Sequence, residues 1–322
     1  MGEIKRIGIL TSGGDAPGMN AALRALVRSG LKAGFTMLGI ERGYAGLLKG
    51  EIRQLNTRSV SEILHAGGTF LLTARSKEFT TPEGLDRAVS IIHEYGIDAL
   101  VVIGGDGSFR GAVSLAEKGI PVIGIPATID NDVASTSYAI GFDTALETAL
   151  DAIDKIRDTS SSHERGSVIE VMGRDAGYIA YAVGLASGAE VTLVPEVPFD
   201  LEKDVLDVIR RGRDIGKHHY IVVMAEGCGS AIEMAEKIEE ATGIVTRGTV
   251  LGYVQRGGRP TAIDRVMASN MGLHAINLLQ KGVVNRLVAV RDGRITDVDA
   301  FEGVNMKKTI PEELLTEAMK LF

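Results

Sequence analysis

The sequence predicts an α/β protein with mainly parallel sheets, and three observations lead to that fold class. Short apolar, β-branched runs alternate with segments of helical spacing along most of the 322 residues, which is typical of repeated strand–helix–strand units. The runs are apolar on both faces, as parallel strands covered by helices on each side require. Glycine clusters follow several of these runs, and the chain has 40 glycines, well above the usual share of about 7%.

The individual elements follow from the same patterns. Apolar runs bounded by Gly or Pro predict strands over residues 6–10, 36–40, 99–103, 122–125, 167–171, 191–194, 220–225 and 288–290. Helical spacing of apolar residues predicts helices over residues 21–33, 108–118, 144–157, 178–187, 205–215, 232–242 and 262–281. No Pro-rich or Ser-rich linker divides the chain, so two domains would have to be connected by several crossings of the chain.

Composition excludes several classes of protein. Hydrophobic residues make up 45% and charged residues 24% of the chain, as in ordinary soluble proteins. The net charge of −7 disfavours a nucleic-acid-binding surface. No apolar stretch of about 18 residues predicts a membrane span, and the N-terminus does not resemble a secretory signal. The single cysteine, Cys228, leads us to expect a cytoplasmic protein.

A first glycine-rich loop follows the strand predicted over residues 6–10. Thr11-Ser-Gly-Gly-Asp-Ala-Pro-Gly18 leads directly into a predicted helix, and backbone N–H groups at a helix N-terminus bind phosphate. The spacing matches neither the dinucleotide-binding G-x-G-x-x-G pattern nor a Walker A loop. The alternative is a tight strand–helix turn in which Asp15 caps the helix.

A second glycine-rich loop, Gly104-Gly-Asp-Gly-Ser108, follows the strand predicted over residues 99–103. Its glycines permit positive φ and a close approach of a phosphate chain. Asp106 can bind Mg²⁺ held on nucleotide phosphates, and Ser108 offers a hydroxyl or a helix cap. The alternative is a tight turn capped by Asp106. Because the pattern also occurs in NAD kinases and diacylglycerol kinases, it indicates kinase chemistry more firmly than one substrate.

Thr128-Ile-Asp-Asn-Asp132 places two carboxylates, an amide and a hydroxyl directly after an apolar run that ends at Pro126. Catalytic groups of open α/β folds gather where strands end, so a carboxylate here can take a proton from a hydroxyl nucleophile. Together with Asp106, the segment predicts phosphoryl transfer. Arginines at strand ends or in glycine-rich loops can hold an anionic substrate bidentately; they are Arg75, Arg157, Arg165, Arg174, Arg247, Arg256 and Arg259.

These motifs together resemble those of the bacterial ATP-dependent 6-phosphofructokinases. The resemblance covers nearly the whole chain and rests on residues 10–20, 104–108, 128–132, 156–163, 171–174 and 255–258. It implies two similar three-layer αβα domains with the active site in the cleft between them. The larger domain, residues 1–138 with 251–303, would bind ATP, and the smaller, residues 139–250 with 304–322, would bind fructose 6-phosphate.

The resemblance also implies residue roles in transferring the γ-phosphoryl group of Mg-ATP to the 1-hydroxyl of fructose 6-phosphate, a step of glycolysis. Asp130 would be the general base, and Thr128 and Arg174 would position or stabilise the transferring group. Asp106 would bind Mg²⁺. The other ATP-binding residues would be Gly14, Arg75, Ser76, Gly105, Gly107 and Ser108. Besides Thr128, Asp130 and Arg174, the residues binding the sugar phosphate would be Ile129, Arg165, Met172, Gly173, Glu226, Arg247, Tyr253, Val254, Gln255 and Arg256.

In the family, residues matching Arg165 and Arg247 reach the sugar 6-phosphate from a neighbouring subunit, which implies a homotetramer with shared active sites. At another subunit interface of the family, ADP activates and phosphoenolpyruvate inhibits. The residues that match this effector site are Arg24, Arg28, Arg157, Gly188, Ala189, Glu190, Lys217 and His219. Ile215 stands where a relative has Lys, with Arg213 or Lys217 as the available replacement.

Three residues bear on which phosphoryl donor is used and on how tightly the sugar phosphate binds. Pyrophosphate-dependent relatives carry Asp in place of Gly107, so Gly107 favours ATP. They carry Lys in place of Ala127, where the ATP-dependent enzymes usually have Gly. Ala127 is neither, but it brings no cation to hold pyrophosphate, so ATP remains the expected donor. Tyr253 stands where the family usually has His. A phenol donates a hydrogen bond but carries no positive charge, which predicts weaker sugar-phosphate binding or a flatter pH dependence of the apparent affinity.

Three alternative functions stay open at this point. They are a pyrophosphate-dependent phosphofructokinase, another Gly-Gly-Asp-Gly kinase acting on NAD or a lipid, and a non-catalytic sugar-sensing α/β protein. The last would need neither Asp106 nor Asp130.

Overall fold

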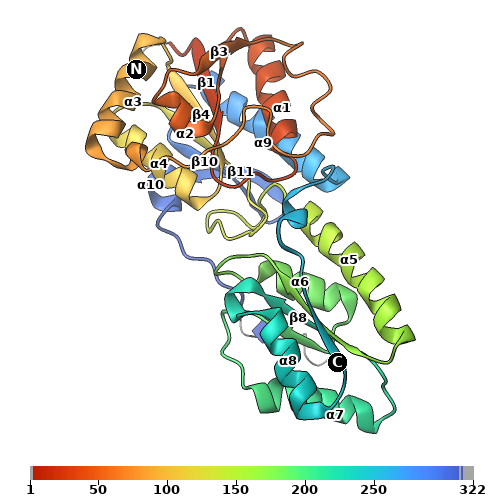
Figure 1. The fold of residues 1–322 in the computed structure, drawn as a ribbon. Coiled ribbons are helices and arrows are strands. Elements are labelled where there is room, and N and C mark those ends of the chain that lie inside the picture. The colour runs from red at the N-terminus through yellow and green to blue at the C-terminus, as the bar shows by residue number, and fades with distance from the viewer. Residues whose placement is uncertain (1–2, 312, 315–322) are drawn as a thin grey trace. The chain divides into compact units, whose positions relative to one another are not determined.

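The computed structural model describes residues 3–311 and 313–314 and divides the chain into two compact units. Unit 1 holds the described residues up to 128 together with 132–144 and 256–308. Unit 2 holds residues 129–131, 145–255 and the described residues from 309 onward (Figure 1). The domain boundaries that we predict, after residues 138, 250 and 303, lie a few residues before these. Residues 312 and 315–322 of the predicted smaller domain lie outside the described residues.

Within the described residues, unit 1 is built on a seven-stranded sheet of order β11-β10-β5-β4-β1-β2-β3. The strands are β1 (Arg6–Thr11), β2 (Thr36–Ile40), β3 (Ile52–Leu55), β4 (Ala99–Gly104), β5 (Val122–Pro126), β10 (Arg286–Arg291) and β11 (Arg294–Asp299). All pairs from β2 across to β10 are parallel, and only the edge strands β3 and β11 are antiparallel to their neighbours. The carboxyl ends of β1, β4 and β5 therefore point to the same edge.

Helices cover both faces of this sheet. They are α1 (Met19–Lys32), α2 (Gly43–Leu47), α3 (Pro82–Glu94), α4 (Asp106–Glu117), α9 (Ala262–Gln280) and α10 (Ala300–Gly303), with the 3₁₀ turn η1 (Glu78–Thr80). On one face, Leu10 and Val102 pack in a core with residues of α2, α3 and α4. On the other, α1 and α9 pack together, and a Cβ on Gly272 would lie only 2.9 Å from the Ala22 carbonyl oxygen. Unit 1 is therefore a three-layer αβα structure.

Unit 2 has a smaller sheet, which is four-stranded in the described part of the chain, with order β7-β8-β6-β9. Its strands are β6 (Gly166–Val171), β7 (Val191–Leu193), β8 (Tyr220–Ala225) and β9 (Thr246–Val250), and all pairs are parallel. The helices are α5 (Phe142–Ser162), α6 (Tyr178–Ser187), α7 (Asp207–Asp214) and α8 (Ala231–Thr242), with the shorter turns η2 (Leu201–Leu206), η3 (Glu226–Cys228) and η4 (Gly252–Arg256). Val222 and Met224 of β8 pack against Ile209 and Ile238 in the core.

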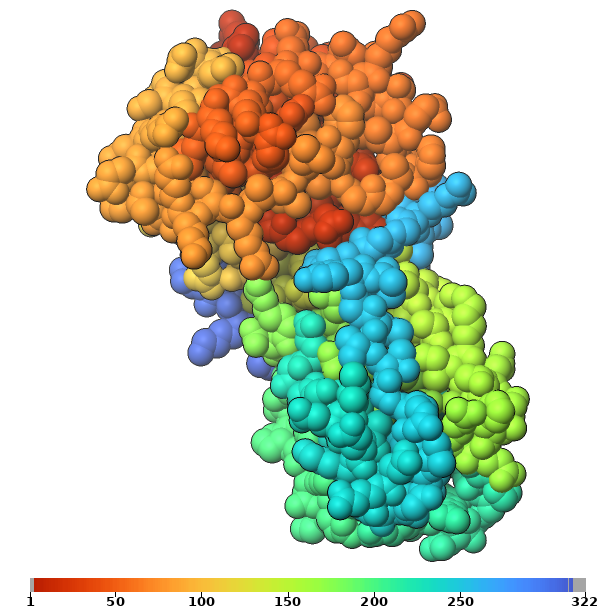
Figure 2. Space-filling view, viewed as in Figure 1, coloured from red at the N-terminus to blue at the C-terminus, as the bar shows by residue number. Residues whose placement is uncertain are grey.

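Every strand and helix predicted from the sequence is present within a few residues. The strands β3, β9 and β11 and the helices α2, α3 and α10 were not predicted from the sequence. Helix α4 begins at Asp106, two positions before the predicted start at Ser108. On the face drawn in Figure 2, the surface of unit 1 is formed mainly by residues from the first third of the chain, drawn orange. No helix in the described part of the chain has both the length and the apolarity needed to cross a membrane.

Candidate active site

The two glycine-rich loops of unit 1 touch each other. They follow β1 and β4, which are parallel neighbours in the sheet. The Ser12 N–H donates to the Ile103 carbonyl over 3.0 Å, and a Cβ on Gly13 would lie 3.3 Å from Ser108 Oγ. A Cβ on Gly104 would lie 2.5 Å from the Ser12 carbonyl oxygen. The two loops therefore form one surface at the carboxyl edge of the sheet.

The glycines of this surface serve two different purposes. Gly13 and Gly18 have φ of 89° and 105°, a region that residues with a Cβ rarely adopt. The expectation that the second loop uses positive φ is wrong, because Gly104, Gly105 and Gly107 are outside that region. Gly104 instead permits the close contact with the first loop. A Cβ on Gly107 would meet nothing within 4 Å, so open space lies in front of it.

Asp106 is accessible at the start of helix α4. Gly105 occupies the N-cap position and no side chain caps the helix, so the capping role considered for Asp106 is not realised. The Asp106 carboxylate pairs with Arg110 over 2.9 Å, and their side chains are 42% and 59% exposed. Asp15 does not cap α1 either, because the N-cap is Gly18, which has no side chain to accept a capping hydrogen bond.

The described residues contain no cluster of three or more His, Cys, Asp or Glu side chains able to hold a metal. A single exposed carboxylate fits Mg²⁺ nevertheless, because Mg²⁺ on nucleotides takes one or two carboxylates and completes its shell with phosphate and water oxygens. The residue that meets this description is Asp106, which follows the open glycine loop.

The segment that carries Arg75 and Ser76 is tied to the first glycine loop. Thr73 Oγ1 donates to the Gly13 carbonyl over 2.8 Å, and Thr11 Oγ1 donates to the Leu72 carbonyl over 2.8 Å. Ser76 Oγ accepts from the Phe79 N–H over 3.2 Å, before the turn η1. These bonds bring Arg75 to the same edge of the sheet as the glycine loops.

A buried aromatic pair holds the second glycine loop in place. Tyr44 and Phe79 stack with ring centroids 3.9 Å apart, and Tyr44 Oη donates to the Ser108 carbonyl over 2.7 Å. Burial raises the pKa of the Tyr44 hydroxyl, which keeps it a hydrogen-bond donor. Ser108 is 5% exposed, so its position in the first turn of α4 is firmly set. Tyr44 is not among the site residues predicted from the sequence.

Thr128 to Asp132 follow β5, and Thr128 lies beside the second glycine loop. The Ala127 N–H donates to the Gly104 carbonyl over 2.9 Å, and a Cβ on Gly105 would lie 3.5 Å from Thr128 Cβ. Thr128 and Asp130 are 8% and 7% exposed. The hydroxyl and the carboxylate are therefore held in a buried segment at a strand end, where solvent competes little for a reacting proton.

In unit 2, a turn that carries Arg174 is fixed by two side chains, of which Glu226 is half-buried and Gln255 is fully buried. Glu226 Oε1 accepts from the N–H groups of Gly173, over 3.2 Å, and Arg174, over 2.7 Å. The Met172 N–H donates to Gln255 Oε1 over 3.3 Å, and Gln255 is fully buried. Arg174 adopts a left-handed φ of 57°, a strained conformation that these contacts maintain. Its side chain is exposed.

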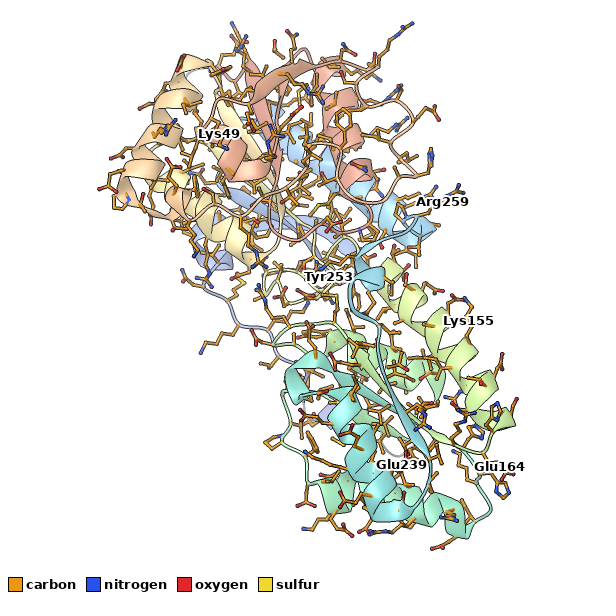
Figure 3. All side chains as sticks on the ribbon, in the orientation of Figure 1. Lys49, Lys155, Glu164, Glu239, Tyr253 and Arg259 are labelled. Carbon is orange, nitrogen blue, oxygen red and sulfur yellow. The ribbon has the colours of Figure 1, made fainter. Side chains whose placement is uncertain are left out.

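The segment after β9 divides between the units. Tyr253 and Val254 in unit 2 are 83% and 60% exposed, and Tyr253 is labelled in Figure 3. Arg256 belongs to unit 1, where its Nη1 donates to the Asp15 carbonyl over 3.3 Å. A Cβ on Gly14 would lie 2.5 Å from that Nη1. The Arg256 side chain, which we predict to bind the sugar phosphate, thus rests on the first glycine loop in this structure.

Arg165 and Arg247 lie at the opposite end of unit 2's sheet from Arg174. Arg165 directly precedes β6, and Arg247 is the second residue of β9. Arg247 pairs with Glu239 over 3.5 Å, and Figure 3 shows Glu239 far from Tyr253. The strand β6 has six residues, and at about 3.3 Å per residue it separates its ends by roughly 17–20 Å. One chain does not bring these arginines to the Arg174 turn.

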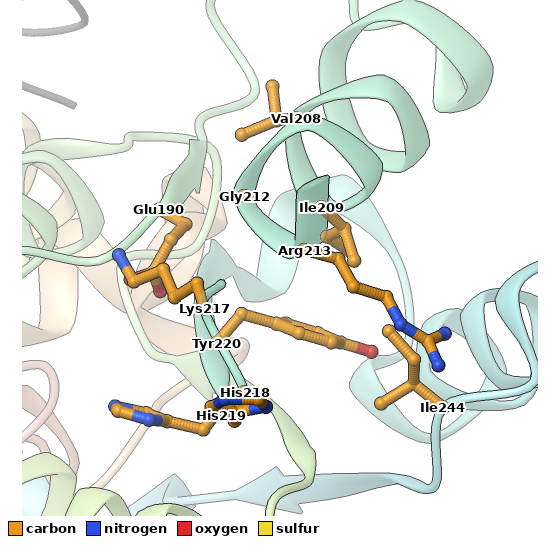
Figure 4. Close-up of a pocket in the computed structure, with 10 residues that line it drawn as sticks. All are labelled: Glu190, Val208, Ile209, Gly212, Arg213, Lys217, His218, His219, Tyr220 and Ile244. Carbon is orange, nitrogen blue, oxygen red and sulfur yellow. The ribbon is translucent and has the colours of Figure 1, made fainter. Parts of the chain in front are cut away.

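The predicted effector residues of unit 2 lie close together. Arg157 Nη2 donates to the Ser187 carbonyl over 2.6 Å, beside Gly188, which ends α6 with φ of 63°. Glu190 accepts from the Ile221 N–H over 2.6 Å and pairs with Lys217. Glu190, Lys217 and His219 line one pocket with Arg213 (Figure 4).

Two predicted effector residues are not part of this group. Arg24 and Arg28 lie on α1, in unit 1. Ile215 is 85% exposed and does not line the pocket, whereas Arg213 and Lys217, the two replacement cations considered above, both do.

Asp264, a fully buried carboxylate in the first turn of α9, is also absent from the residues predicted from the sequence. Thr261-Ala-Ile-Asp264 has the spacing of a capping box, in which the acidic side chain returns to the N-cap N–H. That signal predicts the start of α9, and Thr261 Oγ1 does accept from the Asp264 N–H over 3.3 Å. The Asp264 carboxylate, however, accepts hydrogen bonds from residues 138–144 instead.

The sequence matches a known protein family and several named relatives. The model of the family described as Phosphofructokinase matches residues 6–279. A relative named ATP-dependent 6-phosphofructokinase, from Clostridium tetani, is 54% identical over 318 residues, which cover 99% of both chains. Another, named ATP-dependent 6-phosphofructokinase 1, from Clostridium perfringens, is 51% identical over 311 residues, which cover 97% of both chains.

Solved structures have the same fold. The phosphofructokinase of Pichia pastoris in the T-state matches with a TM-score of 0.91 and 33% identity, over 99% of this chain and 40% of that one. A pyrophosphate-dependent phosphofructokinase from Marinobacter aquaeolei matches with a TM-score of 0.86 and 26% identity, over 96% of this chain and 86% of that one. Because a structure named for pyrophosphate has the same fold, the fold alone does not identify the phosphoryl donor.

Proposed function

The chain belongs to the phosphofructokinase family, and we propose that it is an ATP-dependent 6-phosphofructokinase with the nucleotide on unit 1 and the sugar phosphate on unit 2. It transfers the γ-phosphoryl group of ATP to the 1-hydroxyl of fructose 6-phosphate, giving fructose 1,6-bisphosphate and ADP. The observation that carries the proposal is the joined pair of glycine loops, with accessible Asp106 and buried Thr128 and Asp130 at the same strand ends.

The reaction depends on positioning and on charge neutralisation more than on covalent chemistry. Asp130 takes the proton of the 1-hydroxyl as general base. Thr128 and Arg174 position the transferring group and offset the charge on its oxygens. Asp106 is the residue that would hold Mg²⁺, which supplies further charge neutralisation on the phosphate oxygens when bound.

The nucleotide phosphates bind over the backbone of both glycine loops, at Gly14, Gly105, Gly107 and Ser108, with Arg75 and Ser76 from the neighbouring segment. The open space in front of Gly107 supports ATP, because a phosphate chain can approach a residue that has no Cβ. Ala127 supports the same donor, since it brings no cation to hold pyrophosphate. The names of the closely similar relatives agree with this choice.

The sugar phosphate binds at the Arg174 turn of unit 2. Met172, Gly173, Glu226 and Ile129 surround the sugar. The segment Tyr253, Val254, Gln255 and Arg256 contributes at the phosphate. The support for this assignment is the fixed turn, whose Arg174 side chain remains exposed while Glu226 and Gln255 hold its backbone.

A homotetramer with shared sites explains where Arg165 and Arg247 lie. Both are at the start of unit 2's strands, away from the Arg174 turn of the same chain. A second copy of the chain can supply them to the sugar phosphate. ADP and phosphoenolpyruvate act as effectors at the group formed by Arg157, Gly188, Ala189, Glu190, Lys217 and His219, with Arg24 and Arg28. The enzyme works in the cytoplasm.

A coupled assay of fructose 1,6-bisphosphate formation tests the proposal, with ATP and pyrophosphate compared as donors. We expect turnover with Mg-ATP only. We also expect Asp130→Asn to lose about 10²–10⁴-fold in kcat, the usual contribution of a general base, while it still binds fructose 6-phosphate. Turnover with pyrophosphate would favour the pyrophosphate-dependent alternative. Phosphorylation of NAD or a lipid would favour another kinase, and sugar-phosphate binding without turnover in the parent would favour a sensor.

A further inference from the structure

Asp264 is a buried carboxylate that the reaction does not use. It is 0% exposed, and burying a charge is costly unless hydrogen bonds compensate for the lost water. Its Oδ1 accepts from Tyr138 Oη over 2.5 Å and from the Gly141 N–H over 2.7 Å. Its Oδ2 accepts from the Thr144 N–H over 2.9 Å and from Thr144 Oγ1. All four donors come from residues 138–144, so the carboxylate holds that segment against α9.

Thr261, just before α9, donates hydrogen bonds to the same segment. Its N–H donates to Thr144 Oγ1 over 3.0 Å, and its Oγ1 donates to Asp143 Oδ2 over 2.5 Å. The same Oγ1 accepts from the Asp264 N–H over 3.3 Å and so caps α9. Residues 261–264 and 141–144 therefore each donate hydrogen bonds to the other segment.

The held segment packs against the first glycine loop. Gly141 has φ of 103°, and a Cβ there would lie 2.6 Å from Ala16 Cβ. A Cβ on Gly18 would lie 2.6 Å from Ile140 Cγ2 and 3.5 Å from Asp264 Cβ. Gly18 is also the N-cap of α1. Any shift of residues 140–141 would thus reach the loop that presents Gly14.

The same segment ends where the chain leaves unit 1. Helix α5 starts at Phe142, and the division between the units falls after Thr144, within the first turn of that helix. The chain re-enters unit 1 at Arg256, five positions before Thr261. Asp264 thus bonds to the residues at the first of these crossings and lies eight positions after the second.

We propose that Asp264 is a positioning residue for the phosphoryl transfer. Its carboxylate fixes the first glycine loop and the first turn of α5 as one piece, so that the loop that presents Gly14 keeps one position relative to the start of α5. This role rests on the function proposed above. A misplacement of about 1 Å far from the chemistry can lower a rate roughly 10²-fold, which gives the scale of the effect.

Asp264→Asn is the sharpest test, although it keeps the shape of the side chain. All four donors need an oxygen, and the amide group of Asn would face two of them with its own N–H groups. We expect kcat to fall about 10–100-fold. The dissociation constant for fructose 6-phosphate, measured without nucleotide, should stay within about threefold of the parent. Amide hydrogen exchange should speed up in residues 138–145 and 16–22.

Asp297→Asn provides the matched control. Asp297 also connects α9 to the rest of unit 1, by accepting from His274 Nε2 over 3.0 Å and from Arg286 Nε over 2.6 Å. These hydrogen bonds involve neither residues 138–144 nor residues 261–264. We expect lower thermal stability, parental kcat and parental exchange in residues 138–145.

Single-donor variants keep the test decisive if Asp264→Asn does not fold. Tyr138→Phe and Thr144→Val each remove one hydroxyl donor and should lower kcat by smaller factors. Thr144→Ser keeps the hydroxyl and should have the parental kcat. The proposal is overturned by a folded Asp264→Asn enzyme with parental kcat, by unchanged exchange, or by an equal loss of kcat in Asp297→Asn. If the parent itself has no turnover with fructose 6-phosphate, the proposed function fails, while the exchange data still report whether Asp264 holds residues 138–145.

Discussion

Units 1 and 2 both present loops at the carboxyl ends of parallel strands, but they fix these loops by different means. Unit 1 relies on the absence of side chains, because Gly104 lets two loops touch and Gly107 leaves open space. Unit 2 relies on side-chain hydrogen bonds, because Glu226 and Gln255 hold a turn with Arg174 at positive φ. A surface of bare backbone suits a long phosphate chain, and a side-chain-supported turn suits a compact sugar phosphate.

The largest effect is expected from Gly104→Ala in unit 1. The new Cβ would lie 2.5 Å from the Ser12 carbonyl oxygen and 2.6 Å from Ser108 Oγ, and the backbone atom cannot move without separating the loops. We expect kcat/KM for ATP to fall at least about 10²-fold, the scale of a misplaced reacting group, with lower thermal stability. Gly107→Ala, whose Cβ meets nothing within 4 Å, should keep the parental melting temperature. Equal melting temperatures for both variants would contradict the close-contact role of Gly104.

Glu226→Ala tests whether a side chain holds the Arg174 turn of unit 2 in place. It leaves the Gly173 and Arg174 N–H groups without their acceptor, and hydrogen bonds to a charged group are worth about 1.5–3 kcal/mol each. We expect the dissociation constant for fructose 6-phosphate to rise about 10–100-fold and that for ATP to stay unchanged, as measured by calorimetry. Because both bonds go to a single oxygen, Glu226→Gln can keep them. A Gln variant as weak as the Ala variant would show that the negative charge matters more than the support.

Tyr253→His concerns the exposed end of unit 2's site. A histidine with an ordinary pKa of about 6.5 gains positive charge below neutral pH. We therefore expect affinity for fructose 6-phosphate to rise a few-fold over the parent at pH 6 and to lose that gain by pH 8. Tyr253→Phe serves as the control for the lost hydroxyl. An affinity that matches the parent throughout pH 6–8 would end this interpretation of Tyr253.

The smallest effect is expected from Lys308→Met, in unit 1. Burial lowers the pKa of the Lys308 amine to about 8 from its usual value of 10.5, against the opposing effect of Asp132. The folded state thus releases the proton before the unfolded state does, and keeping this amine charged costs stability below pH 8. We expect the Met variant to be more stable by roughly 1 kcal/mol at pH 7, after discounting for partial exposure. The gain should shrink between pH 8 and 10.5 in denaturant titrations, and a constant gain would contradict the shifted pKa.

The sequence predicts the parallel framework and the glycine loops well because both depend on local signals. Apolar runs such as residues 99–103 identify strands, and the glycines that follow them identify the loops. The edge strands β3 and β11 were missed because they mix charged and apolar residues, and β9 because Arg247 and Gly248 interrupt its apolar pattern.

The supports of the site could not be predicted because they join residues far apart in the chain. Glu226 and Gly173 are 53 positions apart, and Met172 and Gln255 are 83 apart. The sequence identifies Glu226 and Gln255 as candidate sugar-binding residues but gives no sign that they hold the Arg174 turn. Asp264 carries the local signal of a helix cap, whereas its carboxylate serves residues more than a hundred positions away.

The place of Arg165 and Arg247, at the start of unit 2's strands, has a consequence for the behaviour of mixtures. If a second copy supplies these arginines, an Arg247 variant and an Arg174 variant are each inactive for different reasons. Exchange of subunits between them would create some sites that combine an intact Arg174 turn with an intact Arg247. Activity would then return on mixing two dead proteins, and the specific activity of the parent would fall on dilution as the copies separate.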